Sequence, residues 1–458
     1  MTQRDREAIA SVIKAYDVRG VVGDGIDAEL VRDTGAAFGL LMRGEGATRV
    51  VIGHDMRDSS PGLSDAFAEG VRSQGLDTVS LGLTSTDELY FASGTMDCPG
   101  AMFTASHNPA RYNGIKLCRA GARPVGQETG LAEISDMLVD GVPSYDGTAG
   151  TGTSRDVLTD YAAFLHDLVP LDIRPLTVAV DAGNGMGGLT VPAVLGEGSG
   201  LPLTIRDLYF ELDGTFPNHE ANPLAPENLV DLQKYTVAQG ADLGIAFDGD
   251  ADRCFIVDEQ GEPVSPSAIC GIIAERYLDQ HPGATIIHNL ITSKAVPEIV
   301  REHGGTPVRT RVGHSFIKAQ MAEEDAVFGG EHSAHYYFSD FFNADSGMLA
   351  ALHVLATLGG QDRPLSELKQ AYDRYEASGE VNSEVADQQG RTAAVVEAFA
   401  DETVSTDELD GVTVELSDGA WFNVRASNTE PLLRLNVEAA DGSRVGEILD
   451  KALAVIRA

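Results

Sequence analysis

The sequence has 458 residues, 43% of them hydrophobic and 22% charged, which is ordinary for a soluble globular protein and long enough for three or four domains. Its 33 Lys and Arg residues stand against 70 Asp and Glu residues, and the net charge of −37 disfavours nucleic acid and anionic membranes as partners. No stretch has the length and apolar character of a signal peptide or a membrane span, so we expect a cytoplasmic protein.

The first part of the chain alternates predicted strands with predicted helices. Residues 13–20 are predicted to form a short apolar strand that ends in a polar turn carrying Arg19. Apolar runs predict further strands at 50–52, 79–81 and 101–103. Helical spacing predicts helices, the first capped by Asp27, at 27–44, 61–75 and 88–93. This alternation indicates a parallel sheet covered on both faces, with its ligand site at the carboxyl ends of the strands.

The stretch 104–109, Thr-Ala-Ser-His-Asn-Pro, follows the buried run 101–103. A serine at the point where a buried strand enters a polar turn is exposed at one end and rigidly held at the other, which suits a nucleophile or phosphate carrier. His107 and Lys116 add a titratable ring and a cation near Ser106. Taken alone, the stretch is also typical of an ordinary turn, so its interpretation depends on the rest of the chain.

A second α/β unit begins with the strand 176–180 and the glycine-rich turn 181–188. The turn satisfies the pattern G-x-G-x-x-G, which suggests a dinucleotide site. The acidic residue expected at the end of a second strand is not evident, so a plain glycine turn into a helix is the better account.

Three carboxylates follow the next predicted strand, 241–247, at alternate positions: Asp248, Asp250 and Asp252. Small residues separate them, so their oxygens can converge on one hard divalent cation such as Mg²⁺. An EF-hand loop is the rival interpretation, since Glu259 stands at its twelfth position. It fails because Arg253 occupies the sixth position, where glycine is required, and because 254–257 is predicted to be a strand.

The third unit has a strand beginning at 286 and a turn into a helix at 311–318. His332 and His335 lack a third metal ligand at a recognised spacing. Glu331, Ser333 and His335 alternate, so on an extended segment they share one face and suit hydrogen bonds to sugar hydroxyls. A polar strand edge is the alternative.

The last part of the chain differs in kind. Strands at 411–416, 421–424 and 432–437 are predicted to be antiparallel, with a closing helix at 445–456. The turn 425–431 between the second and third strands is rich in hydrogen-bond donors, which is typical of a phosphate-binding turn.

These units predict four domains, with boundaries at 1–150, 151–260, 261–372 and 373–458; an aperiodic, Gly- and Ser-rich linker at 141–154 marks the first boundary. The cysteines show no C-x-x-C pair or zinc spacing, so we expect reduced apolar side chains at Cys98, Cys118, Cys254 and Cys270.

With these motifs in hand, the chain resembles the α-D-phosphohexomutases, most closely the bacterial phosphomannomutase/phosphoglucomutase branch. The matching motifs follow the family's order along the chain, at 14–20, 104–109, 248–253, 330–335 and 425–431. The resemblance implies an α/β fold in which three similar α/β domains with mixed, mainly parallel sheets and a smaller C-terminal α+β domain surround a central cleft.

The resemblance also implies roles for individual residues. Ser106 is the expected phosphoserine and gives one oxygen to Mg²⁺ beside Asp248, Asp250 and Asp252. The other expected catalytic residues are Arg19, His107, Lys116 and His314. The expected substrate-binding residues are Tyr16, Arg253, Glu331, Ser333 and His335, with Arg425, Ser427, Asn428 and Thr429 on the phosphate that does not react.

The implied reaction interconverts hexose 1-phosphate and hexose 6-phosphate, of mannose or glucose, through a hexose 1,6-bisphosphate that turns over in the site and also serves as activator. A monomer or dimer is expected. Three departures leave the sugar preference open: Ala334 stands where bifunctional members often have glycine, these members often have a lysine near the position of Ile291, and the loop 84–87 lacks their common Pro-Thr-Pro pattern. Lys294, three residues further on, is a candidate replacement for that lysine.

Three alternatives stand beside this interpretation. Within the family, the substrate is glucosamine phosphate instead. In another enzyme class, a magnesium-dependent sugar phosphatase uses the same aspartates and releases inorganic phosphate. A noncatalytic sugar-phosphate sensor is the third, and the presence of Ser106 with all three aspartates argues against it.

Overall fold

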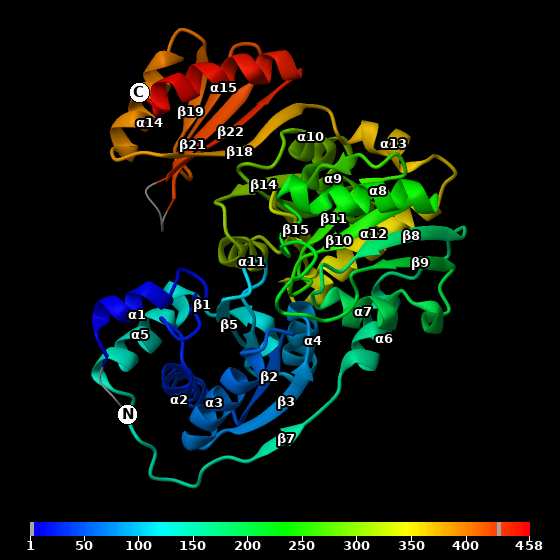
Figure 1. Ribbon diagram of the computed structural model, residues 1–458. Helices are drawn as coiled ribbons and strands as arrows, with labels where there is room; N and C mark the ends of the chain where they lie inside the picture. Colours follow the sequence, from blue (N-terminus) through cyan, green and yellow to red (C-terminus); the bar gives the residue numbers. More distant parts are fainter. Residues whose placement is uncertain (1–3, 428–431) are drawn as a thin grey trace.

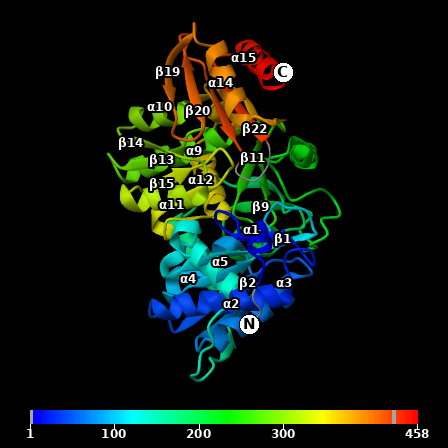
Figure 2. The same cartoon turned by 90° about the vertical axis from the view of Figure 1, so that its left-hand side faces the viewer.

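Four β-sheets, each built from a separate stretch of the chain, organise the structure, a computed structural model in which residues 4–427 and 432–458 are described (Figure 1). The side chains of His314 and Ser315 also lie outside the description. Seen from the side, the N-terminal unit lies at the bottom and the C-terminal unit at the top, with the second and third units at one level between them (Figure 2). No helix of the described residues is long and apolar enough to cross a lipid bilayer.

The N-terminal unit has a mixed sheet in the order β1-β5-β4-β2-β3-β7, with β6 beside β5. Strands β4, β2, β3 and β7 are parallel, whereas β5 runs antiparallel to both of its neighbours, β4 and β1. Its elements are α1 (Arg6–Val12), β1 (Val18–Val21), α2 (Ala28–Gly44), β2 (Arg49–His54), α3 (Ser60–Ser73), β3 (Asp77–Leu83), α4 (Thr86–Met96), β4 (Gly100–Phe103), β5 (Tyr112–Arg119), β6 (Arg123–Pro124), α5 (Leu131–Asp140) and β7 (Gly152–Ser154).

Two details of this unit differ from the sequence predictions. The prediction of a strand from residue 13 that ends in a turn at Arg19 is wrong. Helix α1 ends at Val12, and Arg19 lies inside β1, where it pairs with Gly114 of β5. The predicted linker 141–154 contains β7, which extends the sheet by pairing with β3. The capping prediction is confirmed, since the Asp27 carboxylate accepts a hydrogen bond from Leu30 N at 2.7 Å.

The second unit has the strand order β12-β11-β10-β8-β9, and β10 is parallel to β8 but antiparallel to β11. Its elements are α6 (Leu158–Leu168), β8 (Leu176–Asp181), α7 (Gly187–Val194), β9 (Leu203–Leu208), α8 (Val230–Gln239), β10 (Leu243–Phe247), β11 (Cys254–Asp258) and β12 (Pro263–Val264). The strand predicted at 254–257 is therefore confirmed, and the EF-hand interpretation is excluded.

The third unit has the strand order β14-β13-β15-β16-β17, parallel at first and antiparallel from β16 onward. Its elements are α9 (Pro266–Gln280), β13 (Thr285–Asn289), α10 (Ala295–Glu302), β14 (Thr306–Thr310), α11 (His314–Glu323), β15 (Phe328–Gly330), β16 (Tyr336–Phe338), β17 (Ala344–Asp345), α12 (Gly347–Gly359) and α13 (Leu365–Leu368).

The C-terminal unit is an antiparallel sheet in the order β18-β22-β21-β20-β19, covered by two helices. Its elements are β18 (Glu376–Glu384), α14 (Gln388–Ala398), β19 (Thr403–Asp407), β20 (Val412–Leu416), β21 (Trp421–Ala426), β22 (Leu432–Ala439) and α15 (Gly442–Ile456). The three predicted strands correspond to β20, β21 and β22. The edge strands β18 and β19 were missed because their residues are mostly polar and exposed.

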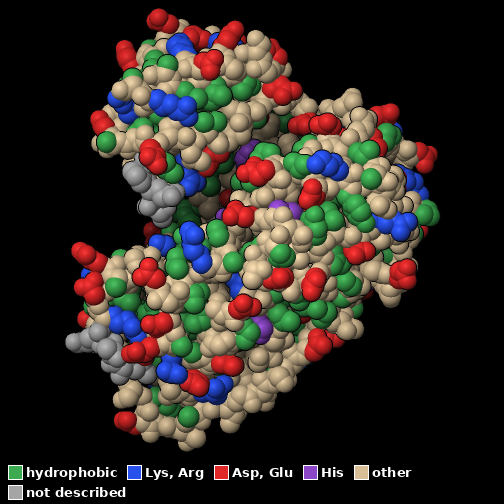
Figure 3. All heavy atoms as spheres, in the orientation of Figure 1, with side chains coloured by type: hydrophobic (Ala, Val, Ile, Leu, Met, Phe, Trp, Pro, Cys, Tyr) green, Lys and Arg blue, Asp and Glu red, His purple; other side chains and the backbone are tan. Residues whose placement is uncertain are grey.

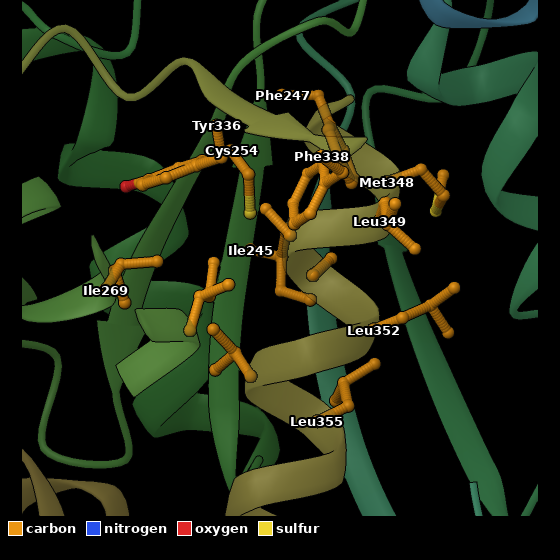
Figure 4. Packing of buried hydrophobic residues seen from close by; sticks show 14 of the residues in the cluster. Ile245, Phe247, Cys254, Ile269, Tyr336, Phe338, Met348, Leu349, Leu352 and Leu355 are labelled. Atoms are coloured by element: carbon orange, nitrogen blue, oxygen red, sulfur yellow. The ribbon is translucent and has the colours of Figure 1, made fainter. Parts of the chain in front are cut away.

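The second and third units share one hydrophobic core, which also includes residues of the first unit such as Leu89 and Phe91 of α4. Helix α12 is buried on nearly all sides, and its Leu349 and Leu352 belong to the same cluster of buried hydrophobic residues as Ile245 and Phe247 of β10 (Figure 4). The C-terminal unit instead has a core of its own, formed between its sheet and its two helices. A domain with its own core can move as a body relative to its neighbours.

A buried carboxyl on α4 makes stability depend on pH. Glu88 is 2% exposed, and burial raises its pKa from 4.5 to about 8. The folded state therefore keeps a proton that the unfolded chain releases, so stability falls as pH rises from about 4.5 to about 8, by ~3–5 kcal/mol in total. We expect Glu88→Gln to match the wild type near pH 4.5 and to exceed it by a few kcal/mol above pH 8.

Urea unfolding at a series of pH values measures this difference. The exposed Glu133 on α5 offers a matched control, because Glu133→Gln should shift stability little at any pH. A Glu88→Gln protein whose advantage does not grow with pH would contradict the assignment of a protonated, buried Glu88.

Candidate active site

Ser106 lies in the loop between β4 and β5, directly beyond the carboxyl end of a strand whose four residues are all buried. Its backbone has φ +48°, a left-handed conformation that is uncommon for a residue with a side chain. Its Oγ donates to Asp248 Oδ2 at 2.7 Å and lies 3.2 Å from His107 Nδ1. The hydroxyl thus lies against the aspartate loop of the second unit, 142 residues away in sequence.

Arg57, which the sequence analysis did not identify, binds the backbone of this loop. It is 1% exposed and pairs with buried Asp55 at 3.1 Å. Its guanidinium donates to four backbone carbonyl oxygens of the loop at 2.7–3.0 Å, those of Ser106, Asn108, Pro109 and Tyr112. A single planar cation therefore fixes the orientation of successive peptide groups around Ser106.

The three aspartates converge as predicted. One carboxylate oxygen from each of Asp248, Asp250 and Asp252 lies within 4.8 Å of the others, and all three side chains are buried. Asp250 Oδ1 and Asp252 Oδ1 are buried without a hydrogen-bond partner. An all-oxygen set with unpartnered carboxylate oxygens suits a hard divalent cation, so the residues fit the magnesium site implied by the sequence.

Basic side chains surround this carboxylate cluster. Lys116 Nζ donates to Asp250 Oδ2 at 2.7 Å and also to Asp252, and Arg253 Nε donates to Asp248 Oδ2 at 2.9 Å. Burial raises the pKa of Asp248 to about 6, although Arg253 opposes the shift. Burial acts in the same direction on Asp252, but Lys116 and His335 outweigh it and hold its pKa well below the usual range.

The glycine-rich turn 181–188 supports the aspartate loop. Met186 N donates to Gly249 O at 2.9 Å, and a Cβ on Gly185 would lie 2.7 Å from the same oxygen. Gly249 in turn faces the serine loop, because a Cβ there would lie 2.4 Å from Ser106 O. The glycines allow close packing of three loops, which accounts for them without a dinucleotide.

The prediction that Glu331, Ser333 and His335 share one face of an extended segment is wrong. The chain reverses between the antiparallel strands β15 and β16, and Glu331 N donates to His335 O at 3.0 Å across the turn. Ala334 has φ +66°, a left-handed conformation that glycine adopts more readily than alanine. The three side chains still meet, since Ser333 Oγ bonds His335 Nδ1 at 2.9 Å and His335 Nδ1 lies 3.7 Å from Glu331 Oε2.

Glu331 is fixed by its own unit. Its carboxylate accepts hydrogen bonds from Asn289 Nδ2 at 3.2 Å, Gly313 N at 3.2 Å and Tyr337 OH at 2.8 Å. The turn also reaches the second unit, where His335 Nε2 lies 3.5 Å from Asp252 Oδ1. Sugar-binding and cation-binding candidates are therefore adjacent.

The predicted phosphate-binding turn is described only at its edges. Arg425 donates to Glu380 of β18, and Ser427 N donates to Leu432 O at 2.9 Å. Asn428 and Thr429 lie outside the described residues, as does the side chain of His314 at the start of α11. Arg434, which pairs with Arg425 in the strand register, has Nη1 3.5 Å from Glu380 Oε1.

A cavity of about 820 Å³ opens in front of Ser106. The lining brings together many predicted residues, namely Tyr16, Arg19, Ser106, His107, Lys116, Asp252 and His335. It adds basic residues that sequence reasoning missed, Lys14 and Arg434, and does not include Glu331, Ser333 or Arg425. The space-filling view shows a hollow between the C-terminal unit above and the N-terminal unit below, with Lys and Arg side chains on its rim (Figure 3).

Family models for phosphoglucomutase/phosphomannomutase match the chain in order: alpha/beta/alpha domains I, II and III at 10–139, 159–261 and 265–375, and the C-terminal domain at 380–455. The chain is 39% identical over 434 residues to a phosphomannomutase of Salmonella montevideo, covering 93% of this chain and 94% of that protein. The chain belongs to the phosphoglucomutase/phosphomannomutase family.

Other relatives agree with this family. The phosphohexose mutases of Xanthomonas campestris pv. campestris are 40% identical over 433 residues, with 93% of this chain and 94% of that protein covered. A solved phosphoglucomutase/phosphomannomutase family protein from Burkholderia thailandensis superposes with a TM-score of 0.89 at 31% identity, covering 98% and 97% of the two chains. The chain is thus an enzyme of the phosphoglucomutase/phosphomannomutase type, and the predicted fold is confirmed.

Proposed function

We propose that this phosphoglucomutase/phosphomannomutase family member interconverts hexose 1-phosphate and hexose 6-phosphate, of mannose or glucose, with Ser106 as the carrier of the phosphoryl group. The observation that carries the proposal is the hydrogen bond from Ser106 Oγ to Asp248 Oδ2 at 2.7 Å. It places a serine hydroxyl at the edge of a three-carboxylate cluster and at the wall of a cavity large enough for a sugar phosphate.

Phosphoryl transfer depends on positioning and on neutralising the charge that spreads over the transferred oxygens. Mg²⁺ held by Asp248, Asp250, Asp252 and one phosphoserine oxygen would supply part of that positive charge. Arg19, Lys116 and Arg253 supply the rest. Arg19 is oriented for this role by hydrogen bonds from its guanidinium to Asn108 Oδ1 at 2.7 Å and to Asp17.

His107 is suited to handle the proton of the attacking sugar hydroxyl. Burial lowers the pKa of its imidazole well below the usual range, and the nearby Arg253 and Arg19 add to the shift. The ring is therefore neutral at physiological pH and can accept a proton or a hydrogen bond beside Ser106. His314 is the expected assistant from the third unit.

The two ends of the substrate need different partners. Phosphoserine gives its phosphoryl group to one end of a hexose phosphate, and the resulting hexose 1,6-bisphosphate must turn so that its other phosphate faces Ser106. We infer that Glu331, Ser333 and His335 hold sugar hydroxyls, while Arg425, Ser427, Asn428 and Thr429 hold the distal phosphate. The C-terminal unit has a separate core, which suits a hinge motion that makes room for the turn.

A ³¹P NMR time course tests the proposal. The protein is incubated with Mg²⁺, a trace of glucose 1,6-bisphosphate, and either mannose 1-phosphate or glucose 1-phosphate. We expect a hexose 6-phosphate signal to grow without free phosphate, and the relative rates to rank the two sugars. Release of inorganic phosphate alone would indicate a phosphatase. No reaction with either sugar would favour glucosamine 1-phosphate or a sugar-phosphate sensor.

A further inference from the structure

The start of helix α4 joins three of the four units. Asp87 accepts hydrogen bonds at 2.6 Å from Tyr161 OH on α6 of the second unit and from Ser346 Oγ at the start of α12 in the third unit. All three side chains are at most 1% exposed. The loop 84–87, which lacks the proline pattern of the resembling family, therefore forms a buried three-unit junction.

Thr86, next in this junction, contacts the aspartate loop directly. Its backbone N donates to Asp250 O at 3.1 Å, and its Oγ1 donates to Asp250 Oδ2 at 2.6 Å. Lys116 Nζ donates to the same Oδ2 at 2.7 Å. Two donors thus hold one oxygen of Asp250, and the other oxygen, Oδ1, is buried without a hydrogen-bond partner.

The Thr86 hydroxyl does not cap helix α4. Ser85 is the capping residue of α4, and its Oγ accepts a hydrogen bond from Glu88 N. The Thr86 side chain is 0% exposed, so its hydroxyl is committed to Asp250 rather than to solvent.

We propose that Thr86 is a positioning residue for the divalent cation: by holding Asp250 Oδ2, it turns Asp250 Oδ1 toward the point where the three carboxylates converge. The proposal rests on the proposed function in assigning these aspartates to Mg²⁺. Partners that orient a metal ligand commonly change metal affinity by ten- to a hundredfold. Because Thr86 belongs to the N-terminal unit and Asp250 to the second, the cation site is complete only when the two units are docked.

Isothermal titration of the purified protein with MgCl₂, in the absence of sugar phosphate, tests this role. We expect Thr86→Val to weaken Mg²⁺ binding by roughly ten- to a hundredfold, because valine keeps the shape and removes the donor. Thr86→Ser keeps the donor and should bind with near wild-type affinity. Tyr161→Phe is the matched control, since it removes a hydrogen bond of the junction without touching Asp250.

Three results would overturn the proposal: wild-type affinity in folded Thr86→Val, equal weakening in Thr86→Ser, or equal weakening in Tyr161→Phe, which would assign the effect to unit docking. Should Thr86→Val not fold, Thr86→Ala removes the same donor and is judged by the same criteria. Binding is measured without turnover, so a protein that binds Mg²⁺ in this pattern but converts no hexose phosphate refutes the proposed function alone.

Discussion

Ser106→Ala is expected to lower the rate of hexose phosphate interconversion by roughly four orders of magnitude or more, as removal of a catalytic nucleophile does in other enzymes. The change removes one hydroxyl and little else. Alanine meets the same backbone strain at φ +48° as serine does, and Arg57 contacts only the carbonyl oxygen of residue 106. The loop and the aspartates should therefore keep their positions.

Transfer of radiolabelled phosphate from glucose 1,6-bisphosphate to the protein measures the carrier role directly. Wild-type protein should retain label after denaturation, and Ser106→Ala should not. Ser64→Ala on α3 is the control and should be labelled like the wild type, because the Ser64 Oγ donates within its own helix, to Pro61 O at 2.8 Å. Labelling of Ser106→Ala, or a rate within tenfold of the wild type, would refute the proposed mechanism.

The positions of Ser106 and Asp248 could each be predicted, because each follows a buried strand, whereas their meeting across two units was implied only by the resemblance to the family. Strand β4 is parallel to β2 in the first sheet, and β10 is parallel to β8 in the second. Residues beyond the carboxyl ends of such strands gather at one edge of a sheet, where ligands bind. Three carboxylates at alternate positions repel one another unless a cation binds them, so the cation site could be predicted from the sequence.

Other parts of the site could not be predicted, for identifiable reasons. The alternation of Glu331, Ser333 and His335 has the period of a strand, yet Ala334 adopts a positive φ and the segment turns. Nothing in the local pattern signals that an alanine will accept this conformation. The contact between Thr86 and Asp250 joins residues 164 positions apart, and no periodicity specifies a hydrogen bond between two units.

The burial of Arg57 likewise could not be predicted from the sequence. In the sequence it follows a predicted strand in a polar loop and resembles any solvated arginine. Its burial arises because the serine loop directs four carbonyl oxygens at one point, and only the folded backbone shows this. Phe216 of the second unit covers it, with its ring centroid 5.0 Å from the guanidinium carbon.

Arg57→Met is expected to destabilise the protein by ~3–5 kcal/mol and to lower kcat at the same time. The loss of stability arises because Asp55 is 0% exposed and burial already raises its pKa, so without the paired cation its carboxylate is uncompensated and must take up a proton. The loss of rate has a different cause, since the four loop carbonyls lose their common donor and Ser106 is no longer held in place. Displacement of a reacting group by about 1 Å can cost about a hundredfold in rate.

The double variant Asp55→Asn/Arg57→Met separates the two effects. Removing the unpaired carboxylate should restore the part of the free energy of unfolding that its lost pairing costs, whereas the four loop carbonyl oxygens still lack their donor, so kcat should remain about a hundredfold below the wild type. Urea unfolding and the NMR assay measure the two quantities on the same protein. If kcat recovers together with stability, Arg57 serves only to balance Asp55. If stability recovers alone, the orientation of the loop peptides by Arg57 is what keeps Ser106 reactive.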